Sequence, residues 1–152
     1  MFPTAHFGLG TLMFFVSILV GVPMELGIFV VIGSILPDID FFLLDRKHFH
    51  RKCLIHTPIF WLFMIAVLSL TPLAIVGLFT AIGVFSHLIL DTFDWGIMWL
   101  YPFDKKLIGG TLRKTIGKEK NFMGHYFSNK VFLLADMILV IFSVFIWAFI
   151  LA

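Results

Sequence analysis

The side chains best suited to chemistry in this chain lie near residue 90. His87 and Asp91 are four residues apart in a stretch that reads as an α-helix, so both side chains lie on the same helical face. An imidazole and a carboxylate one turn apart can bind one metal ion, or two adjacent ions. The alternative is a simple His–Asp hydrogen bond at a helix end. Because other residues of the same kinds occur nearby, we expect metal binding.

A second acidic element precedes it. Pro37 disfavours helical geometry at the residue before it and bends the backbone, which allows Asp38 and Asp40 both to point inward. Carboxylates can bridge two cations, and we expect one of these two to be the principal ligand, with the choice left open. The alternative is an aspartate that caps a helix or stabilises a turn.

A third element combines histidines with an arginine. His56 directly precedes an apolar segment whose start at Pro58 suits the first turn of a helix. We expect His56, and less directly His50, to be metal ligands. Arg51 could bind a phosphate through two hydrogen bonds, although a cation beside an apolar segment also anchors membrane topology.

The remaining ionisable residues add one ligand and several weaker possibilities. His6, near the start of the first apolar segment, is expected to be a ligand. The residues that could assist as ligands or outer partners are His48, His125, Asp94 and Asp136. Cys53 is the single cysteine, so no intrachain disulfide can form, and we expect it to be a bystander thiol.

The elements that must position these residues are membrane helices. Of the 152 residues 61% are hydrophobic and 13% are charged, and the mean hydropathy is +1.06, which only contact with lipid makes tolerable. Apolar segments lie at about 5–21, 24–37, 57–71, 73–90 and 131–151. Gly21-Val22-Pro23 breaks the first two, and the third and fourth meet at Thr71-Pro72, where Pro72 suits the first turn of a new helix. Because unsatisfied backbone groups are costly in hydrocarbon, these segments should be helices. We therefore predict an all-α integral membrane protein, a single domain over 1–152, with about five transmembrane helices.

The basic residues predict the orientation. All 11 Lys and Arg residues lie in two polar loops, at about 45–56 and 91–130. With five spans both loops are on the same side, which the positive-inside bias makes cytoplasmic, together with the N-terminus and the metal site. The aromatic segment 95–101 should lie along the membrane as an amphipathic or re-entrant piece between helices four and five.

A family resemblance rests on these motifs in order. Thr4-Ala5-His6, Leu36 to Asp40, His50-Arg51 with His56-Thr57-Pro58, Ser86 to Asp91, and Trp95-Gly96 with Tyr101-Pro102-Phe103 cover about 1–106. They resemble the LexA-binding, inner-membrane-associated hydrolases, also described as membrane-bound metal-dependent hydrolases, a family grouped with the zinc-dependent phospholipase C and single-strand nuclease superfamily. The resemblance implies an all-α zinc centre in which His87 and Asp91 match the helical pair. It also implies that His6, Asp38 or Asp40, and His56 supply further ligands, with His125 and Glu119 as candidates for later ones.

The function that follows is hydrolysis of a phosphoester at the inner membrane. We expect a divalent metal ion, zinc first, a lipid or lipid-linked phosphate substrate, and no nucleic-acid partner. Asp38, Asp40 and Arg51 are the expected catalytic residues. Two alternatives stay open: a protein that binds, transports or senses metal without hydrolysis, and a membrane interaction protein whose basic loop contacts anionic lipids or a DNA-associated partner.

Overall fold

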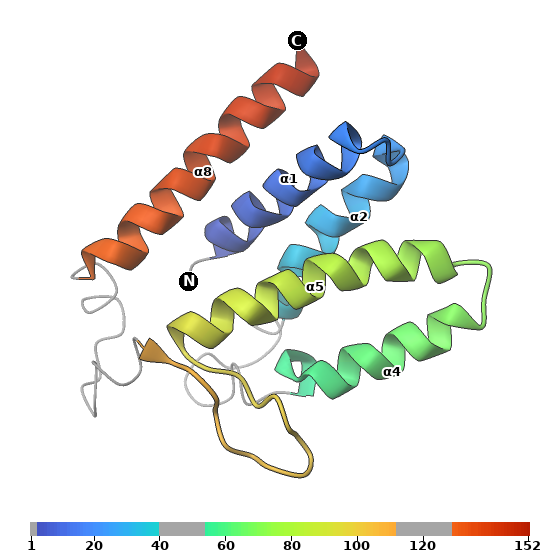
Figure 1. The fold of residues 1–152 in the computed structure, drawn as a ribbon, viewed down its shortest axis with the longest axis vertical. Helices are drawn as coiled ribbons and strands as arrows, with labels where there is room; N and C mark the ends of the chain where they lie inside the picture. Colours follow the sequence, from blue (N-terminus) through green and yellow to red (C-terminus); the bar gives the residue numbers. More distant parts are fainter. Residues whose placement is uncertain (1–2, 40–53, 112–128) are drawn as a thin grey trace.

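The computed structural model describes residues 3–39, 54–111 and 129–152, and the regular secondary structure of these residues is helical. Its helices are α1 (Pro3–Leu19), α2 (Met24–Ile35), α4 (Pro58–Ser69), α5 (Ala74–Asp94) and α8 (Lys130–Leu151), with short 3-10 helices η1 (Leu36–Ile39) and η2 (Leu54–His56) (Figure 1). No strand occurs in these residues; one antiparallel bridge joins Ile97 to Ile108. The prediction of an all-α chain is confirmed for the described residues, and each predicted segment corresponds to one of the five α-helices.

Two helical hairpins come from the two predicted breaks. Gly21 has a φ of 87°, a conformation that glycine adopts without steric cost, and it turns the chain between α1 and α2. In the second hairpin α5 begins at Ala74. Pro72 therefore lies just before the helix, whereas we had expected it in the first turn. Pro58 does occupy the first turn of α4, as predicted.

The two hairpins are joined by a close contact between α2 and α5. A Cβ atom at Gly33 would overlap the backbone oxygen of Thr80, and one at Gly83 would overlap the backbone oxygen of Val30. Small residues at such positions let two helix backbones approach closely, as is common between membrane helices. The contact fixes the C-terminal half of α2 against the middle of α5.

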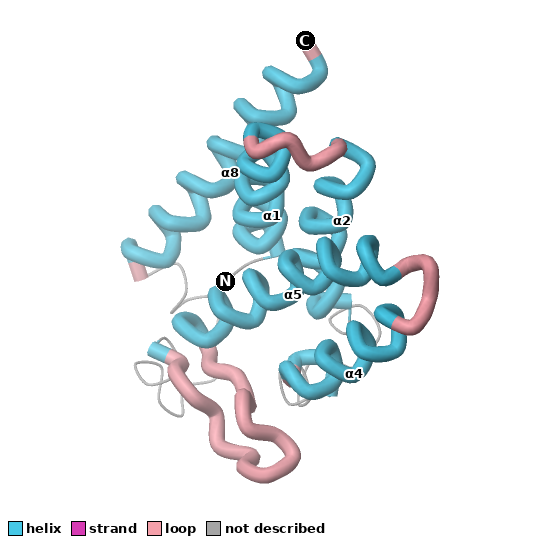
Figure 2. Tube along the Cα trace, turned by 45° about the vertical axis from the view of Figure 1, so that its right-hand side comes forward, coloured by secondary structure: helices cyan, strands magenta, loops and turns pink. Residues whose placement is uncertain are grey.

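The arrangement brings four chain segments to one side of the molecule. Helix α1 packs against α2 and also against α8, while α5 packs against α2, α4 and α1 (Figures 1 and 2). The start of α1, the end of α2, the start of α4 and the C-terminal half of α5 therefore lie near one another. These are the segments that carry the predicted ligands.

The helix lengths support fewer full spans than we predicted. Crossing the hydrocarbon core takes about 20 apolar residues. Two helices are long and apolar enough by this measure, α5 with 21 residues and α8 with 22. Helix α1 has 17 residues, and α2 and α4 have 12 each, so five transmembrane helices are not supported.

The segment after α5 is a loop without regular helix, and its expected place along the membrane stays a prediction. It leaves α5 at Trp95 and returns at Gly110, whose backbone N–H donates to the oxygen of Thr92 at 2.8 Å. The Trp99 indole donates to the Thr92 hydroxyl at 2.8 Å, and Ile97 is fully buried. The loop, drawn in pink after α5 in Figure 2, is thus tied to the helix at its base, and its Phe103 is exposed.

Candidate metal centre

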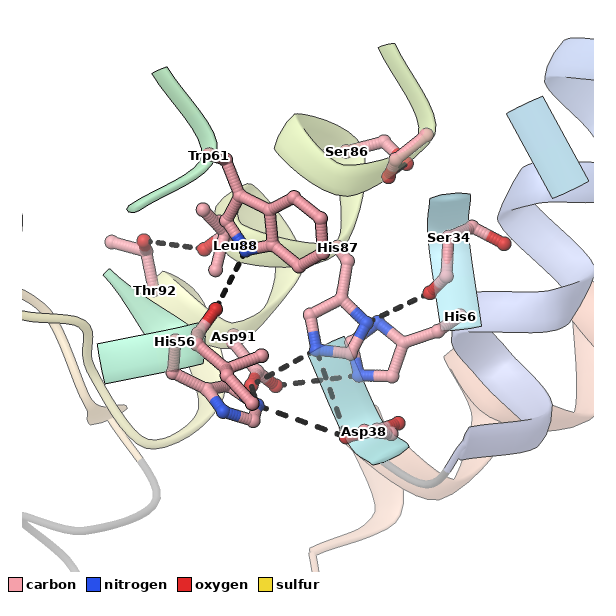
Figure 3. Close-up of polar contacts among 12 residues, drawn as sticks. His6, Ser34, Asp38, His56, Trp61, Ser86, His87, Leu88, Asp91 and Thr92 are labelled. Atoms are coloured by element: carbon pink, nitrogen blue, oxygen red, sulfur yellow. Dashed lines mark hydrogen bonds and ion pairs between the residues drawn. The ribbon is translucent and has the colours of Figure 1, made fainter. Parts of the chain in front are cut away.

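Five buried His and Asp side chains from four elements meet in one cluster. Helix α1 contributes His6, η1 contributes Asp38, η2 contributes His56, and α5 contributes His87 and Asp91 (Figure 3). Four of the five are fully buried, and Asp38 is 4% exposed. Burial of this many ionisable groups is costly unless they pair with one another or bind metal.

The distances within the cluster suit metal ligands. His87 Nε2 lies 3.7 Å from Asp38 Oδ1 and 3.5 Å from Asp91 Oδ2, and His56 Nε2 lies 3.9 Å from each of the same two oxygens. All four separations are longer than a charge-assisted hydrogen bond. Two overlapping groups have donor atoms within 4.8 Å of one another: His6, His87 and Asp91, and Asp38, His56 and His87. By the distances between donor atoms alone, either group could hold a metal ion.

The ring of His87 is oriented by the backbone of α2. Its Nδ1 lies 2.8 Å from the carbonyl oxygen of Ser34. A carbonyl oxygen only accepts, so the neutral ring carries its proton on Nδ1 and presents an unprotonated Nε2 to the cluster. Such a partner on the far side of the imidazole is typical of metal-binding histidines.

His56 is held by a small set of contacts around η2. The Thr57 hydroxyl donates to the Leu54 oxygen at 2.6 Å, and the Trp61 indole N–H donates to the Ile55 oxygen at 2.6 Å. Trp61 itself packs in the hydrophobic core with Val84 and Leu88 of α5. The turn that carries His56 is therefore anchored to both α4 and α5.

His6 contacts the cluster through His87 and Asp91. Its ring stacks on that of His87 with centroids 3.7 Å apart, and its Nε2 lies 3.3 Å from Asp91 Oδ1. Its Nδ1 has no hydrogen-bond partner among the described residues. Glycine at position 10, where a Cβ atom would overlap the Ser34 hydroxyl, allows α1 to come this close to α2.

The charge state of Asp38 suits a cation. Burial raises the pKa of this carboxyl, but the neighbouring His56, His87 and His6 outweigh that effect and hold the pKa below its ordinary value. At neutral pH Asp38 is therefore ionised.

The predicted residues divide into those that meet here and those whose positions stay untested. The cluster unites His6, Asp38, His56, His87 and Asp91. Asp40, His50 and Arg51 lie outside the described residues, as do His48, Cys53, Glu119 and His125. Asp94 and Asp136 are buried, but neither belongs to the two groups that could hold a metal among the described residues.

Two groups that hold the histidines of the cluster in place were not predicted from the sequence. The Ser34 carbonyl carries no residue-type signal, because every residue has one. Trp61 was not singled out either, although an indole N–H buried in an apolar core usually finds a hydrogen-bond partner, and this was the available signal.

The comparisons with known proteins give a family and no nearer relative. No curated protein and no solved structure matches the chain. One family model matches the whole chain, residues 1–152, and its description is "YdjM inner membrane protein". This agrees with the membrane location implied by the resemblance and with the two apolar helices, while the likeness to phospholipase C stays a prediction. The chain belongs to the YdjM inner membrane protein family.

Proposed function

We propose that this chain is a metal-dependent hydrolase of the inner membrane that acts on the phosphoester of a lipid or lipid-linked substrate. The observation that carries the proposal is the buried cluster, in which three imidazoles and two carboxylates from four separate elements turn donor atoms toward one another over 3.3 to 3.9 Å. Hydrophobic residues would fill this space with a smaller desolvation cost. The buried polar set is therefore best explained by a bound metal ion.

The chemistry follows from the donor types. Imidazole nitrogen together with carboxylate oxygen is the ligand set of zinc and neighbouring divalent transition metals. A bound ion of this kind would supply Lewis-acid chemistry, which lowers the pKa of a water molecule and neutralises a phosphate. In this proposal Asp38 and Asp91 supply carboxylate ligands of the ion, while Arg51, outside the described residues, is the proposed phosphate-binding cation.

The membrane location supplies the substrate class. Helices α5 and α8 are joined by a chain segment that contains seven of the 11 Lys and Arg residues, counting Lys130 at the start of α8. Under the positive-inside bias this side is cytoplasmic. We propose a multi-pass chain with the cluster at this cytoplasmic end, near the level of lipid headgroups.

A hydrolysis assay tests the proposal. The purified full chain in detergent, loaded with Zn²⁺, should release inorganic phosphate from phosphatidic acid or a polyprenyl monophosphate, in each case by hydrolysis of the phosphoester bond. His87→Ala and removal of metal with a chelator should each lower the rate by at least 100-fold. Asp104→Ala is the matched control, because Asp104 is exposed and accepts only the local Lys106 N–H among the described contacts.

One observation favours a second function. The side chains in the cluster are almost completely buried, and closed sites are typical of structural metal ions, whereas catalytic ones keep an open position. A non-catalytic metal-binding or regulatory protein would bind the metal with the same ligands, yet release no phosphate from either substrate.

A further inference from the structure

The orientation of the imidazole rings separates His6 from the other members of the cluster. A neutral imidazole coordinates through a lone pair that lies in the plane of its ring. The rings of His6 and His87 are stacked, with centroids 3.7 Å apart and planes inclined by only 21°. An ion in the plane of one ring therefore lies well out of the plane of the other. Although the donor atoms of these two histidines are close enough, their rings cannot both point at one ion.

His56 and His87, in contrast, are arranged as two ligands of one ion. Their ring centroids are 5.6 Å apart and their planes are inclined by 57°. Two imidazoles on one tetrahedral zinc ion, with bonds of about 2.1 Å, have centroids about 5 Å apart. The observed arrangement needs only a small contraction.

The two carboxylates complete a four-atom set. His87 Nε2 and His56 Nε2 each face Asp38 Oδ1 and Asp91 Oδ2, with four separations from 3.5 to 3.9 Å. The edge of a tetrahedron of ligands with bonds of about 2.1 Å measures about 3.4 Å. The set is close to that size before any ion draws it together.

Asp91 connects His6 to this set through its second oxygen. Oδ2 faces His56 and His87, while Oδ1 lies 3.3 Å from His6 Nε2. When the second oxygen of a ligand carboxylate contacts another polar group, that group orients the carboxylate. Removal of such an outer partner typically lowers metal affinity by about 10-fold to 100-fold.

We propose that the centre binds one ion through Asp38, His56, His87 and Asp91, and that His6 is a positioning residue that holds the Asp91 carboxylate without binding the ion. This inference rests on the proposed metal centre and assigns its stoichiometry and the role of each side chain. A second ion between His6 and Asp91 would have two protein donors among the described residues, fewer than the three or four typical of zinc sites.

Titration of the metal-free full chain with Co²⁺ tests the assignment, because the visible absorption of Co²⁺ is strong in tetrahedral sites and weak in six-coordinate ones. The wild type should bind one Co²⁺ per chain with tetrahedral absorption. His6→Ala should bind one Co²⁺ with the same spectrum but with 10-fold to 100-fold lower affinity. His6→Gln, which can keep an N–H facing Asp91, should recover most of that affinity, and Thr4→Ala, an exposed site on the same helix, should match the wild type.

Three results would overturn the assignment. If the wild type binds two Co²⁺ per chain, or if His6→Ala and His6→Gln both lose the tetrahedral spectrum as completely as His87→Ala, His6 is a ligand and the metal centre itself stands. If the wild type binds no Co²⁺, both the assignment and the proposed function fail.

Discussion

At the residue scale the cluster depends on a few polar contacts that lie behind it. His87 presents Nε2 because Nδ1 is bonded to the Ser34 carbonyl, and His56 faces inward because Trp61 and Thr57 hold the turn that carries it. Ser34, Thr57 and Trp61 do not belong to the proposed ligand set. Loss of the Thr57 or Trp61 side-chain hydrogen bond should therefore weaken metal binding without removing a donor atom.

Trp61→Phe tests this at one atom. The substitution keeps the aromatic packing but removes the 2.6 Å hydrogen bond to the Ile55 oxygen. We expect a stability loss of about 1 kcal/mol and a metal affinity about 10-fold lower, measured by thermal unfolding and by metal titration in detergent.

Trp147→Phe is the matched control for that variant. The Trp147 indole donates to the Thr11 hydroxyl at 3.2 Å between α8 and α1, and its partner is not a residue of the cluster. It should lower stability by a similar amount and leave metal affinity unchanged. Equal affinity losses in the two variants would show that the Trp61 contact has no special part in positioning His56.

At the element scale the cluster exists because α2 and α5 approach closely. Gly33 and Gly83 are the points of contact. Directly after Gly33, Ser34 of α2 supplies the carbonyl partner of His87, and the following η1 supplies Asp38. A small displacement of α2 from α5 would move both of these groups away from His87.

Gly83→Ala should separate these helices. Its Cβ would overlap the Val30 oxygen and lie 2.7 Å from the Ser34 nitrogen, which are backbone atoms that cannot rotate away. We expect a loss of about 1–3 kcal/mol in stability together with weaker metal binding. Gly77→Ala on the same helix meets only the side chain of Leu68, at 3.0 Å, and should be nearly neutral. Thermal unfolding of the two variants compares them directly, and equal stability would refute the close-contact explanation.

Much of this element-level picture could be predicted from the sequence. Hydrophobic runs, Gly21 and Pro58 predicted five helices and their order, and the expectation that helix ends alternate between two sides brought His6, Asp38, His56, His87 and Asp91 to the same side. The ring orientations, the glycine contacts and the choice of Asp38 as a member of the cluster depend on how helices pack. Spacing along a chain does not determine that packing, since each pair of helices could meet at several angles.

At the scale of the whole molecule the described part of the chain is covered by apolar side chains. Helix α8 is the clearest case, because it packs mainly on α1 and leaves large residues such as Phe145 and Phe149 exposed. Exposed apolar surface of this extent is expected where lipid covers it. The same helix starts at Lys130, where the Asn129 side chain accepts the N–H groups of Val131 and Phe132.

Cysteine labelling tests the orientation of the molecule. In a Cys53→Ser background, which removes the single native cysteine, Asp104→Cys lies in the loop after α5 and Thr71→Cys lies in the loop before it. If α5 spans the membrane with its C-terminal end in the cytoplasm, a membrane-impermeant maleimide should label Thr71→Cys in intact cells and Asp104→Cys only after lysis. The reverse pattern would place the cluster at the other membrane face.

Metal analysis of the purified chain tests the proposed centre most directly. Purified without chelators, the wild type should carry at least about 0.5 equivalents of a divalent transition metal. Asp91→Ala should carry almost none while staying folded by circular dichroism, and Asp104→Ala should match the wild type, because Asp104 is an exposed carboxylate in the loop after α5. A wild-type protein that is metal-free and fails to take up Zn²⁺, Co²⁺ or Mn²⁺ on addition, or an Asp91→Ala variant that keeps its metal, would contradict the assignment of this cluster as a metal centre.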